Sequence, residues 1–157
     1  MLALQLDNTA VKTFMGQILR EDIFDMFEVR SIDIAVATRI NIDGQLEAGP
    51  QEDDSEGKKP GFATWGALRP LVLGIIKTSP KPGYMKIVFS YPAVGACEIH
   101  ANAAALFLNM AYENDTVTFT TGASQREFAL DKTLDANWDE WVRGFFTKAG
   151  LQVSDRS

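Results

Sequence analysis

The sequence predicts an α+β fold: a mainly antiparallel sheet of about five to six strands, packed by an N-terminal, a middle and a C-terminal helix. Between residues 104 and 130, apolar residues alternate with polar ones, which is typical of half-buried strands. From Leu134 to Phe146 they recur at helical spacing instead. A chain of 157 residues forms one domain by default and buries enough surface for a core. We therefore expect residues 1–157 to form a single domain in which the C-terminal helix covers the apolar side of the sheet.

The N-terminal part predicts a strand followed by a helix. Leucines alternate with other residues over 2–6, which indicates a short strand. Asp7, Asn8 or Thr9 then offers an oxygen to cap a helix. The helix has an apolar face with spacings of three and four: Val11, Phe14, Met15, Ile18 and Leu19. Residues 23–27 predict a second short turn or an extension of this helix.

Residues 29–42 carry the clearest strand pattern, with isoleucines at even positions. Asp43-Gly44 is a favoured two-residue hairpin pair, because both positions of a type I′ turn need positive φ. Gln45 and Leu46 are therefore expected to start a return strand. The acidic stretch that follows, residues 47–61, predicts a mobile surface loop.

A middle helix is expected after Thr64, which can act as its N-cap. Pro70 leaves two alternatives: a turn through Trp65 followed by a helix from Pro70, or one kinked helix. Residues 85–91 then alternate as a strand that ends at Pro92. Residues 93–103 are rich in alanine and predict a linker or one turn of helix.

The last third predicts a three-stranded meander and a helix. Its strands are expected at 106–112, at 117–119 and at 128–130, with turns at 113–115 and 121–124. The helix that follows has a broad apolar face: Leu134, Trp138, Trp141, Val142, Phe145 and Phe146. This helix is expected to pack on the apolar face of the meander.

Composition excludes several classes of function. The formal net charge is −6 and no basic run is present, which argues against binding to duplex nucleic acid. The longest apolar run, residues 71–76, is too short to span a membrane. Cys97 is the single cysteine, and the first seven residues lack the basic region of a secretory signal. We expect a cytoplasmic protein without a membrane segment.

A set of short motifs spread over most of the chain resembles a family of uncharacterised bacterial single-domain proteins. The motifs are Trp65-x3-Arg69-Pro70, Ile76-Lys77, Lys86-Ile87-Val88-Phe89, Leu106-Phe107-Leu108-Asn109, Tyr112-Glu113-Asn114, Thr120-Thr121-Gly122, Phe128-x-Leu130-Asp131-Lys132-Thr133-Leu134 and Trp138-Asp139. The resemblance implies membership of that family and carries no activity with it.

The sequence has no strong catalytic motif. Phosphate-binding loops, dinucleotide fingerprints, the nucleophile elbow and zinc-type clusters are all missing from it. Cys97 and His100 are three residues apart, but two of four zinc ligands would be lacking, and a Cys–His nucleophile pair is the less favoured reading. We expect no cofactor and no bound metal.

Four cations lie beside apolar residues expected in the core: Arg69, Lys77, Lys86 and Lys132. Their convergence would form a pocket for a small anionic ligand, to which Thr121 and Ser124 could add hydroxyls. The favoured alternative is structural: Arg69 and Asp131 pair or cap helices, and the lysines extend into water.

Two hypotheses about function follow. The first is a non-enzymatic binding or interaction domain that forms a homodimer through a strand edge or the apolar helix face. It draws on the aromatic content, although Trp65, Tyr84, Tyr91 and Tyr112 are more readily explained as core or rim. The second is an enzyme or sensor that binds a small anion near Arg69, Lys77 and Lys86.

Overall fold

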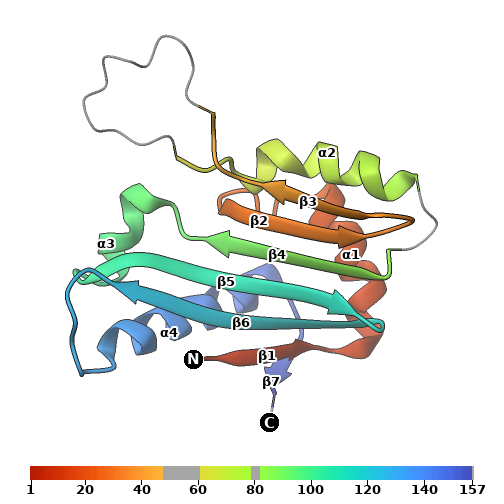
Figure 1. The fold of residues 1–157 in the computed structure, drawn as a ribbon. Coiled ribbons are helices and arrows are strands. Elements are labelled where there is room, and N and C mark those ends of the chain that lie inside the picture. Colours follow the sequence, from red (N-terminus) through yellow and green to blue (C-terminus); the bar gives the residue numbers. More distant parts are fainter. Residues whose placement is uncertain (48–60, 79–81, 157) are drawn as a thin grey trace.

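The computed structural model describes residues 1–47, 61–78 and 82–156, and it has the predicted α+β class (Figure 1). Two short 3₁₀ turns, η1 and η2, accompany the helices and strands. The elements in chain order are β1 (Ala3–Leu6), η1 (Asn8–Ala10), α1 (Val11–Arg20), β2 (Glu28–Ala35), β3 (Arg39–Asp43), α2 (Trp65–Lys77), β4 (Tyr84–Ser90), η2 (Ala93–Gly95), α3 (Ala96–Ile99), β5 (Ala103–Glu113), β6 (Thr116–Gln125), α4 (Thr133–Ala149) and β7 (Val153–Asp155).

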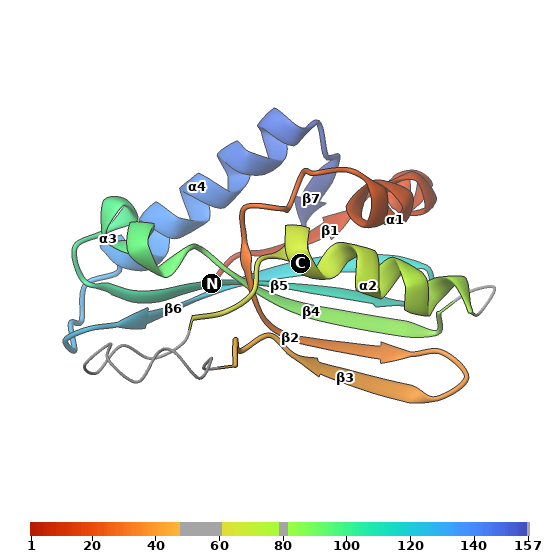
Figure 2. The same ribbon diagram turned by 90° about the horizontal axis from the view of Figure 1, so that it is seen from above.

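The strands form one sheet in the order β3-β2-β4-β5-β6-β1-β7, and every neighbouring pair is antiparallel. Figure 2 shows that α1, α2 and α4 lie on the same side of this sheet. The N-terminal, middle and C-terminal helices were all predicted. The strand number was not, because seven described strands replace the expected five to six.

The predicted third strand of the meander, at 128–130, is wrong. Its place beside β6 is taken by β1, with Ala3 opposite Thr120. The expected turn at 121–124 is also wrong, since these residues continue β6 to Gln125. Phe128 and Leu130 instead lie in the β6–α4 loop, with exposed fractions of 85% and 82%. β1 and β6 are more than a hundred residues apart, so no local pattern in the sequence indicates that they pair. The alternation at 128–130 therefore led to the wrong strand beside β6.

The hairpin turn predicted at Asp43-Gly44 is wrong as well. The chain turns between β2 and β3, where Val36 donates its N–H to Thr38 O. In this hairpin Ile34 lies opposite Ile40 and Ile32 opposite Ile42, so even positions face one another. The alternation therefore continues through the turn without a break, and two strands look like one.

Gly44 has a different reason to be glycine. A Cβ at this position would lie 1.8 Å from the carbonyl oxygen of Val29. The backbone passes too close to β2 for any side chain, and Ala63 donates its N–H to Gly44 O. Gln45 forms only an isolated bridge with Phe62. Among the described residues, the predicted return strand is reduced to this bridge, in which Leu46 donates its N–H to Gly61 O at 2.8 Å.

The other local predictions agree with the structure. Asp7 caps the first turn by accepting the Thr9 N–H at 2.9 Å. The turn between β5 and β6 has positive φ at Asn114 (53°) and Asp115 (57°), the backbone that a type I′ hairpin needs. Residues 93–103 contain η2 and the short helix α3.

The middle helix, α2, is one continuous helix that begins at Trp65 and contains Pro70. Thr64 is its N-cap and accepts the Ala67 N–H at 3.3 Å. Pro70 lies on the solvent-exposed side and has no N–H to donate to the carbonyl of Gly66, so the helix passes it with one backbone hydrogen bond fewer. Of the two alternatives, the single helix is therefore correct, because α2 runs without a break from Trp65 through Pro70.

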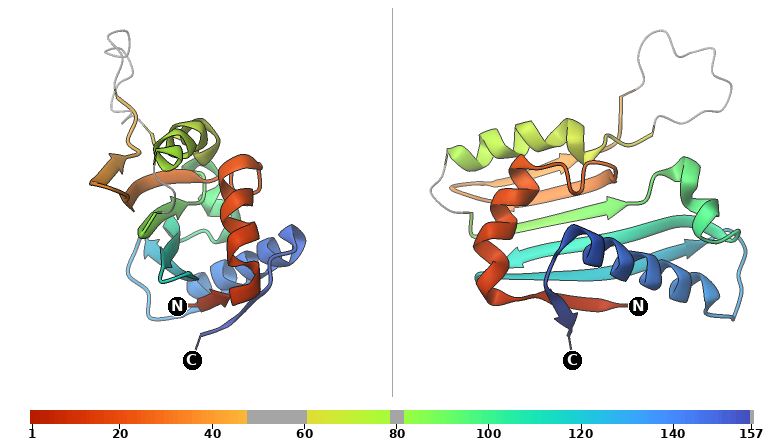
Figure 3. Two further views of the ribbon diagram at one scale, coloured as in Figure 1. Left: turned by 90° about the vertical axis from the view of Figure 1, so that its right-hand side faces the viewer. Right: turned by 180° about the vertical axis from the view of Figure 1, so that it is seen from behind.

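An aromatic cluster fills the space between α4 and the sheet. Phe24, in the segment between α1 and β2, is fully buried and lies at its centre. Its ring centroid is 5.2 to 6.4 Å from six others: Phe14, Phe27, Phe89, Phe119, Phe145 and Phe146. Trp138 of α4 is fully buried too, and its indole N–H donates to Phe107 O at 2.8 Å. The prediction that α4 covers the apolar side of the sheet is confirmed, as Figure 3 shows from behind.

Two further predictions concern the acidic loop and the absence of a membrane segment. The acidic loop at 47–61 falls almost entirely outside the described residues. Among the described helices, none is both long and apolar enough to cross a membrane.

Candidate functional site

The candidate site is a groove between α1 and α2, and α1 supplies one wall. Residues four apart lie on one helix face, so two parallel stripes run along this wall. The stripes are Val11, Met15 and Leu19, and beside them Lys12, Gly16 and Arg20. One stripe is apolar, and the other places a cation on each side of a glycine.

The second wall comes from α2, and the far end is lined by the end of β5 and the turn between β5 and β6. Leu73, Ile76 and Lys77 face the groove from the C-terminal half of α2. Tyr112 and Asp115 lie at this end. We call this cavity the α1–α2 groove; its volume is about 680 Å³, and its described lining is completed by Asn8 and Pro82. It falls within the size range of ordinary small-molecule sites.

Gly16 keeps the groove open. A Cβ built at this position meets nothing within 4 Å, so no neighbouring atom requires a glycine there. An interior glycine costs a helix about 1 kcal/mol relative to alanine. The residue therefore reduces helix stability and, in return, leaves space between the two helices.

The groove has an apolar floor and a mainly cationic rim. Lys12, Arg20 and Lys77 are exposed and contribute three positive charges. Asp115 contributes a negative one and accepts the Tyr112 hydroxyl at 3.1 Å. The rim is thus net positive over its described residues, in contrast to the whole chain, whose formal charge is −6.

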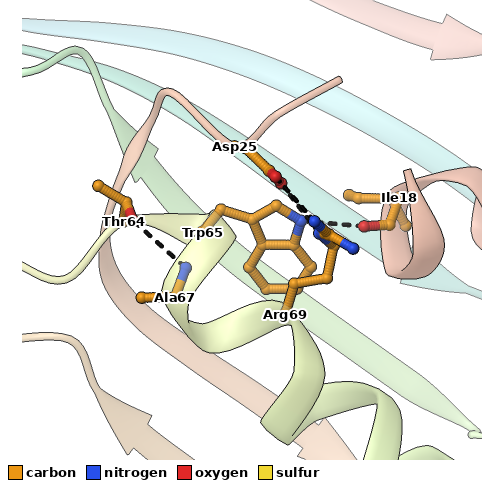
Figure 4. Close-up of polar contacts among 6 residues, drawn as sticks. All are labelled: Ile18, Asp25, Thr64, Trp65, Ala67 and Arg69. Carbon is orange, nitrogen blue, oxygen red and sulfur yellow. Dashed lines mark hydrogen bonds and ion pairs between the residues drawn. The ribbon is translucent and has the colours of Figure 1, made fainter. Parts of the chain in front are cut away.

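Two contacts fix α2 against the segment that contains α1. The buried Trp65 donates its indole N–H to Ile18 O at 2.9 Å. Arg69 donates two hydrogen bonds to Asp25, from Nε at 2.9 Å and from Nη2 at 2.8 Å. Both are drawn in Figure 4. They hold the walls of the groove at a fixed separation.

Arg69 therefore serves a structural contact and does not line the groove. Its hydrogen bonds with Asp25 raise the pKa of the guanidinium, and the negative charge of the carboxylate adds to this. The sequence-based alternative had Arg69 and Asp131 either pair or cap helix ends; the pairing is wrong, whereas for Asp131 the capping agrees with its contacts at the start of α4. Asp131 accepts hydrogen bonds from the backbone N–H and hydroxyl of Thr133 instead.

The other predicted site residues are dispersed over the molecule. Lys86 alternates with the buried Met85 and Ile87 on β4, so it points to the sheet face opposite the helices. Lys132 is exposed just before α4, and Ser124 is exposed near the end of β6. Of the four predicted cations, only Lys77 is found in the α1–α2 groove.

Thr121 is buried and connects three segments of the framework. Its hydroxyl donates to Asp139 Oδ1 of α4 at 2.6 Å and accepts the backbone N–H of Leu2 at 2.8 Å. Both functions of the hydroxyl are used within the chain, so Thr121 acts in packing α4 and the N-terminus on β6.

Cys97 and His100 do not contact each other through any hydrogen bond among the described residues. His100 Nδ1 accepts the Asn102 N–H at 3.0 Å, which places the imidazole proton on Nε2. Nε2 then donates to Thr133 Oγ1 at 3.0 Å. In this tautomer His100 cannot take a proton from Thr133. No group of three or more His, Cys, Asp or Glu suited to a metal occurs in the described part of the chain.

Sequence reasoning missed Lys12, Gly16 and Arg20. The apolar spacing of α1 indicates the face that enters the core and says nothing of the neighbouring stripe. The available signal was the spacing, because positions 12, 16 and 20 are one helical turn apart each. Only the tertiary structure shows that α2 lies against this stripe.

These features define an α+β protein whose antiparallel sheet is covered by helices on one face and carries a cation-rimmed groove between two of them. The chain belongs to a family of unknown function (DUF5721), whose model matches residues 17–154. The match begins within α1 and includes all of α2. Comparison with curated proteins and with solved structures gave no match.

Proposed function

We propose that this protein is a binding domain whose α1–α2 groove takes an amphipathic anion: an apolar body with a carboxylate, sulfate or phosphate group. The observation that carries the proposal is the combination of five apolar side chains in the groove with three cations at its rim: Val11, Met15, Leu19, Leu73 and Ile76, with Lys12, Arg20 and Lys77.

The two parts of the lining have different functions in this proposal. The apolar body gives most of the affinity, at about 25 cal/mol for each Å² removed from water. The rim charges are exposed, so each adds little energy and is screened by salt. Their effect is selectivity, because a cationic head group would be repelled by the same rim.

The proposal is tested with three amphiphiles of one tail length: dodecanoate, dodecanol and dodecyltrimethylammonium. Binding is measured by calorimetry below the micelle concentrations of the two charged amphiphiles and below the solubility limit of dodecanol. We expect dodecanoate to bind most tightly and dodecyltrimethylammonium most weakly, by about tenfold or more. The preference for the anion should shrink as salt is added.

A groove-filling variant locates the binding. Gly16→Leu places a side chain in the groove without a clash at Cβ, and dodecanoate affinity should fall by about tenfold or more. Gly144→Leu is the matched control, since Gly144 lies on α4 and its Cβ also meets nothing within 4 Å. Equal affinity in the two variants, or equal affinity for the three amphiphiles, would overturn the proposal.

Several broader features belong to the same proposal. The chain forms one domain, and the resemblance to bacterial proteins and the single Cys97 support a bacterial source and a cytoplasmic location.

A second copy is also proposed as a partner. The apolar face of α4 is used inside the chain. Of the two edge strands, β3 carries the charged residues Arg39 and Asp43 and β7 has only three residues, and both features discourage edge pairing. Self-association therefore needs another surface.

A further inference from the structure

The β6–α4 loop, residues 126–132, displays two large apolar side chains to solvent. Phe128 is 85% exposed and Leu130 is 82% exposed. Neither belongs to the hydrophobic core of the chain, so both leave a large apolar surface in contact with water. Isolated exposed hydrophobics are ordinary, but two of this size on one short loop call for a partner surface.

The backbone on both sides of Phe128 is held by side-chain amides. Asn102 accepts the Glu127 N–H at 2.9 Å and donates to Glu127 O at 2.8 Å. Gln125 accepts the Ala129 N–H and donates to Ala129 O, both at 3.1 Å. Each amide thus binds both polar groups of one loop residue. The loop is ordered by these two clamps and not by burial of Phe128 or Leu130.

A loop ordered in this way is pre-organised for binding. Its conformational entropy has already been lost on folding, so docking would not have to order the backbone again. The far end is fixed too, because Asp131 accepts the backbone N–H and hydroxyl of Thr133 at 2.9 and 2.6 Å. The two apolar side chains are therefore presented in a fixed arrangement.

The charges that flank these side chains complement the α1–α2 groove. Glu127 and Asp131 are exposed on either side of Phe128 and Leu130. Arg126 is directed back to the sheet, where its Nε donates to Ala103 O at 3.1 Å. The loop thus offers an apolar pair between two acids, with Arg126 and the exposed Lys132 one residue farther out on either side. The groove offers an apolar floor below a cationic rim, so the acids nearest to the apolar pair match it in charge.

We propose that the Phe128 and Leu130 loop of one copy docks into the α1–α2 groove of a second copy. This inference rests on the proposed function, because the same groove is occupied, and it names the protein partner of that site. The loop lies at the end of the molecule that carries α3, whereas the groove ends at the β5–β6 turn, at the opposite end (Figure 1). Contact between different surfaces of two copies gives head-to-tail association. With two anchoring side chains the contact is small, so the assembly is weak and depends on concentration.

The test uses complementation between two defective variants. Sedimentation velocity should show wild-type oligomers of increasing mass from micromolar to millimolar concentration. Phe128→Ser with Leu130→Ser removes the loop anchors, and Gly16→Leu fills the groove, so each variant alone should be monomeric. A mixture of the two should give a one-to-one dimer, because one intact loop then meets one intact groove. Gly144→Leu should associate like wild type.

Three results would overturn the inference: a monomeric wild type over the whole range, undiminished association of the loop variant, or no dimer in the mixture. Failure of the proposed function is separable, because the loop variant retains the groove. If it binds dodecanoate but the wild type does not associate, only the self-docking is wrong. If wild type associates, dodecanoate should dissociate it by competing for the groove, and association unaffected by saturating dodecanoate would also contradict the docking site.

Discussion

Under α4 the side chains fill the space above the sheet, whereas between α1 and α2 they leave a cavity of about 680 Å³. Both regions lie on the same face of one sheet. Beneath α4, Phe145, Phe146 and Trp141 interlock with rings from the sheet and from the segment between α1 and β2. In the groove, α1 presents Gly16, which has no side chain to fill the space. The difference shows two ways of holding a helix over the sheet. α4 is held by close packing of aromatic rings, whereas α2 is held beside α1 by the Trp65 and Arg69 hydrogen bonds, which leave the space between the two helices unfilled.

The largest expected effect is in the filled region. Trp138→Ala removes a fully buried ring and its hydrogen bond to Phe107 O, so it should destabilise the fold by about 3 to 5 kcal/mol. Met15→Ala, beside the open groove, should cost roughly 1 to 2 kcal/mol, since Met15 already borders a cavity. Urea denaturation of both variants measures the contrast, and equal losses would show that the two regions are packed alike.

A buried polar contact also belongs to the filled region. Thr121→Val keeps the side-chain shape but leaves the Leu2 N–H without its acceptor and Asp139 without its donor. The expected loss is about 1 to 3 kcal/mol in urea denaturation. Thr120→Val, the neighbouring position on the half-exposed opposite face of β6, is the control and should stay within about 0.5 kcal/mol. Similar losses at the two positions would mean that the Thr121 hydroxyl does not hold α4.

The open region predicts a gain of stability. Gly16→Ala adds a methyl group where nothing lies within 4 Å and improves helix propensity, so stability should rise by about 0.5 to 1 kcal/mol. Gly144→Ala should give a similar gain for the same reason. The measurement is the urea midpoint at unchanged slope. A loss at Gly16 alone would indicate that the groove is closed in solution.

The smallest effect concerns the loop that leads into α4. The hydroxyl of Thr133, and then its backbone N–H, hold the pKa of Asp131 below its ordinary value of 3.8. A folded pKa below the unfolded one stabilises the protein above the unfolded value, and this contribution is lost as the pH falls through the folded pKa. The difference in urea midpoint between wild type and Asp131→Ala should therefore be full at neutral pH and shrink in acid below about pH 4.

Asp131→Asn supplies the control for this titration. Neither the amide nor alanine ionises in this range, so the difference between Asp131→Asn and Asp131→Ala should be constant with pH. A wild-type difference that is equally constant would contradict the assigned hydrogen bonds.

Most features set by residues close together in the sequence were predicted correctly, whereas strand pairing between residues far apart was not. The helices at α1, α2 and α4 were predicted because their apolar faces repeat within a few residues. The turn at Asn114-Asp115 was predicted because its backbone needs residues that tolerate positive φ. The third meander strand failed because β1, far away in the sequence, pairs with β6. Phe128 and Leu130 alternate like a strand but face solvent.

The candidate site was less predictable than the fold. Lys77 was identified as a ligand-binding candidate, but Arg69 is used by Asp25 and Lys86 lies on the opposite face of the sheet. The sequence by itself determined the helices α1, α2 and α4 and most of the strands, since hydrophobic periodicity repeats within a few residues. It did not determine the sheet edge beside β6, where Phe128 and Leu130 alternate like a strand but lie in solvent. Only the tertiary structure decided that α1 and α2 face each other across a gap, because the distance between two helices depends on the Trp65 and Arg69 contacts made by residues far apart in the chain.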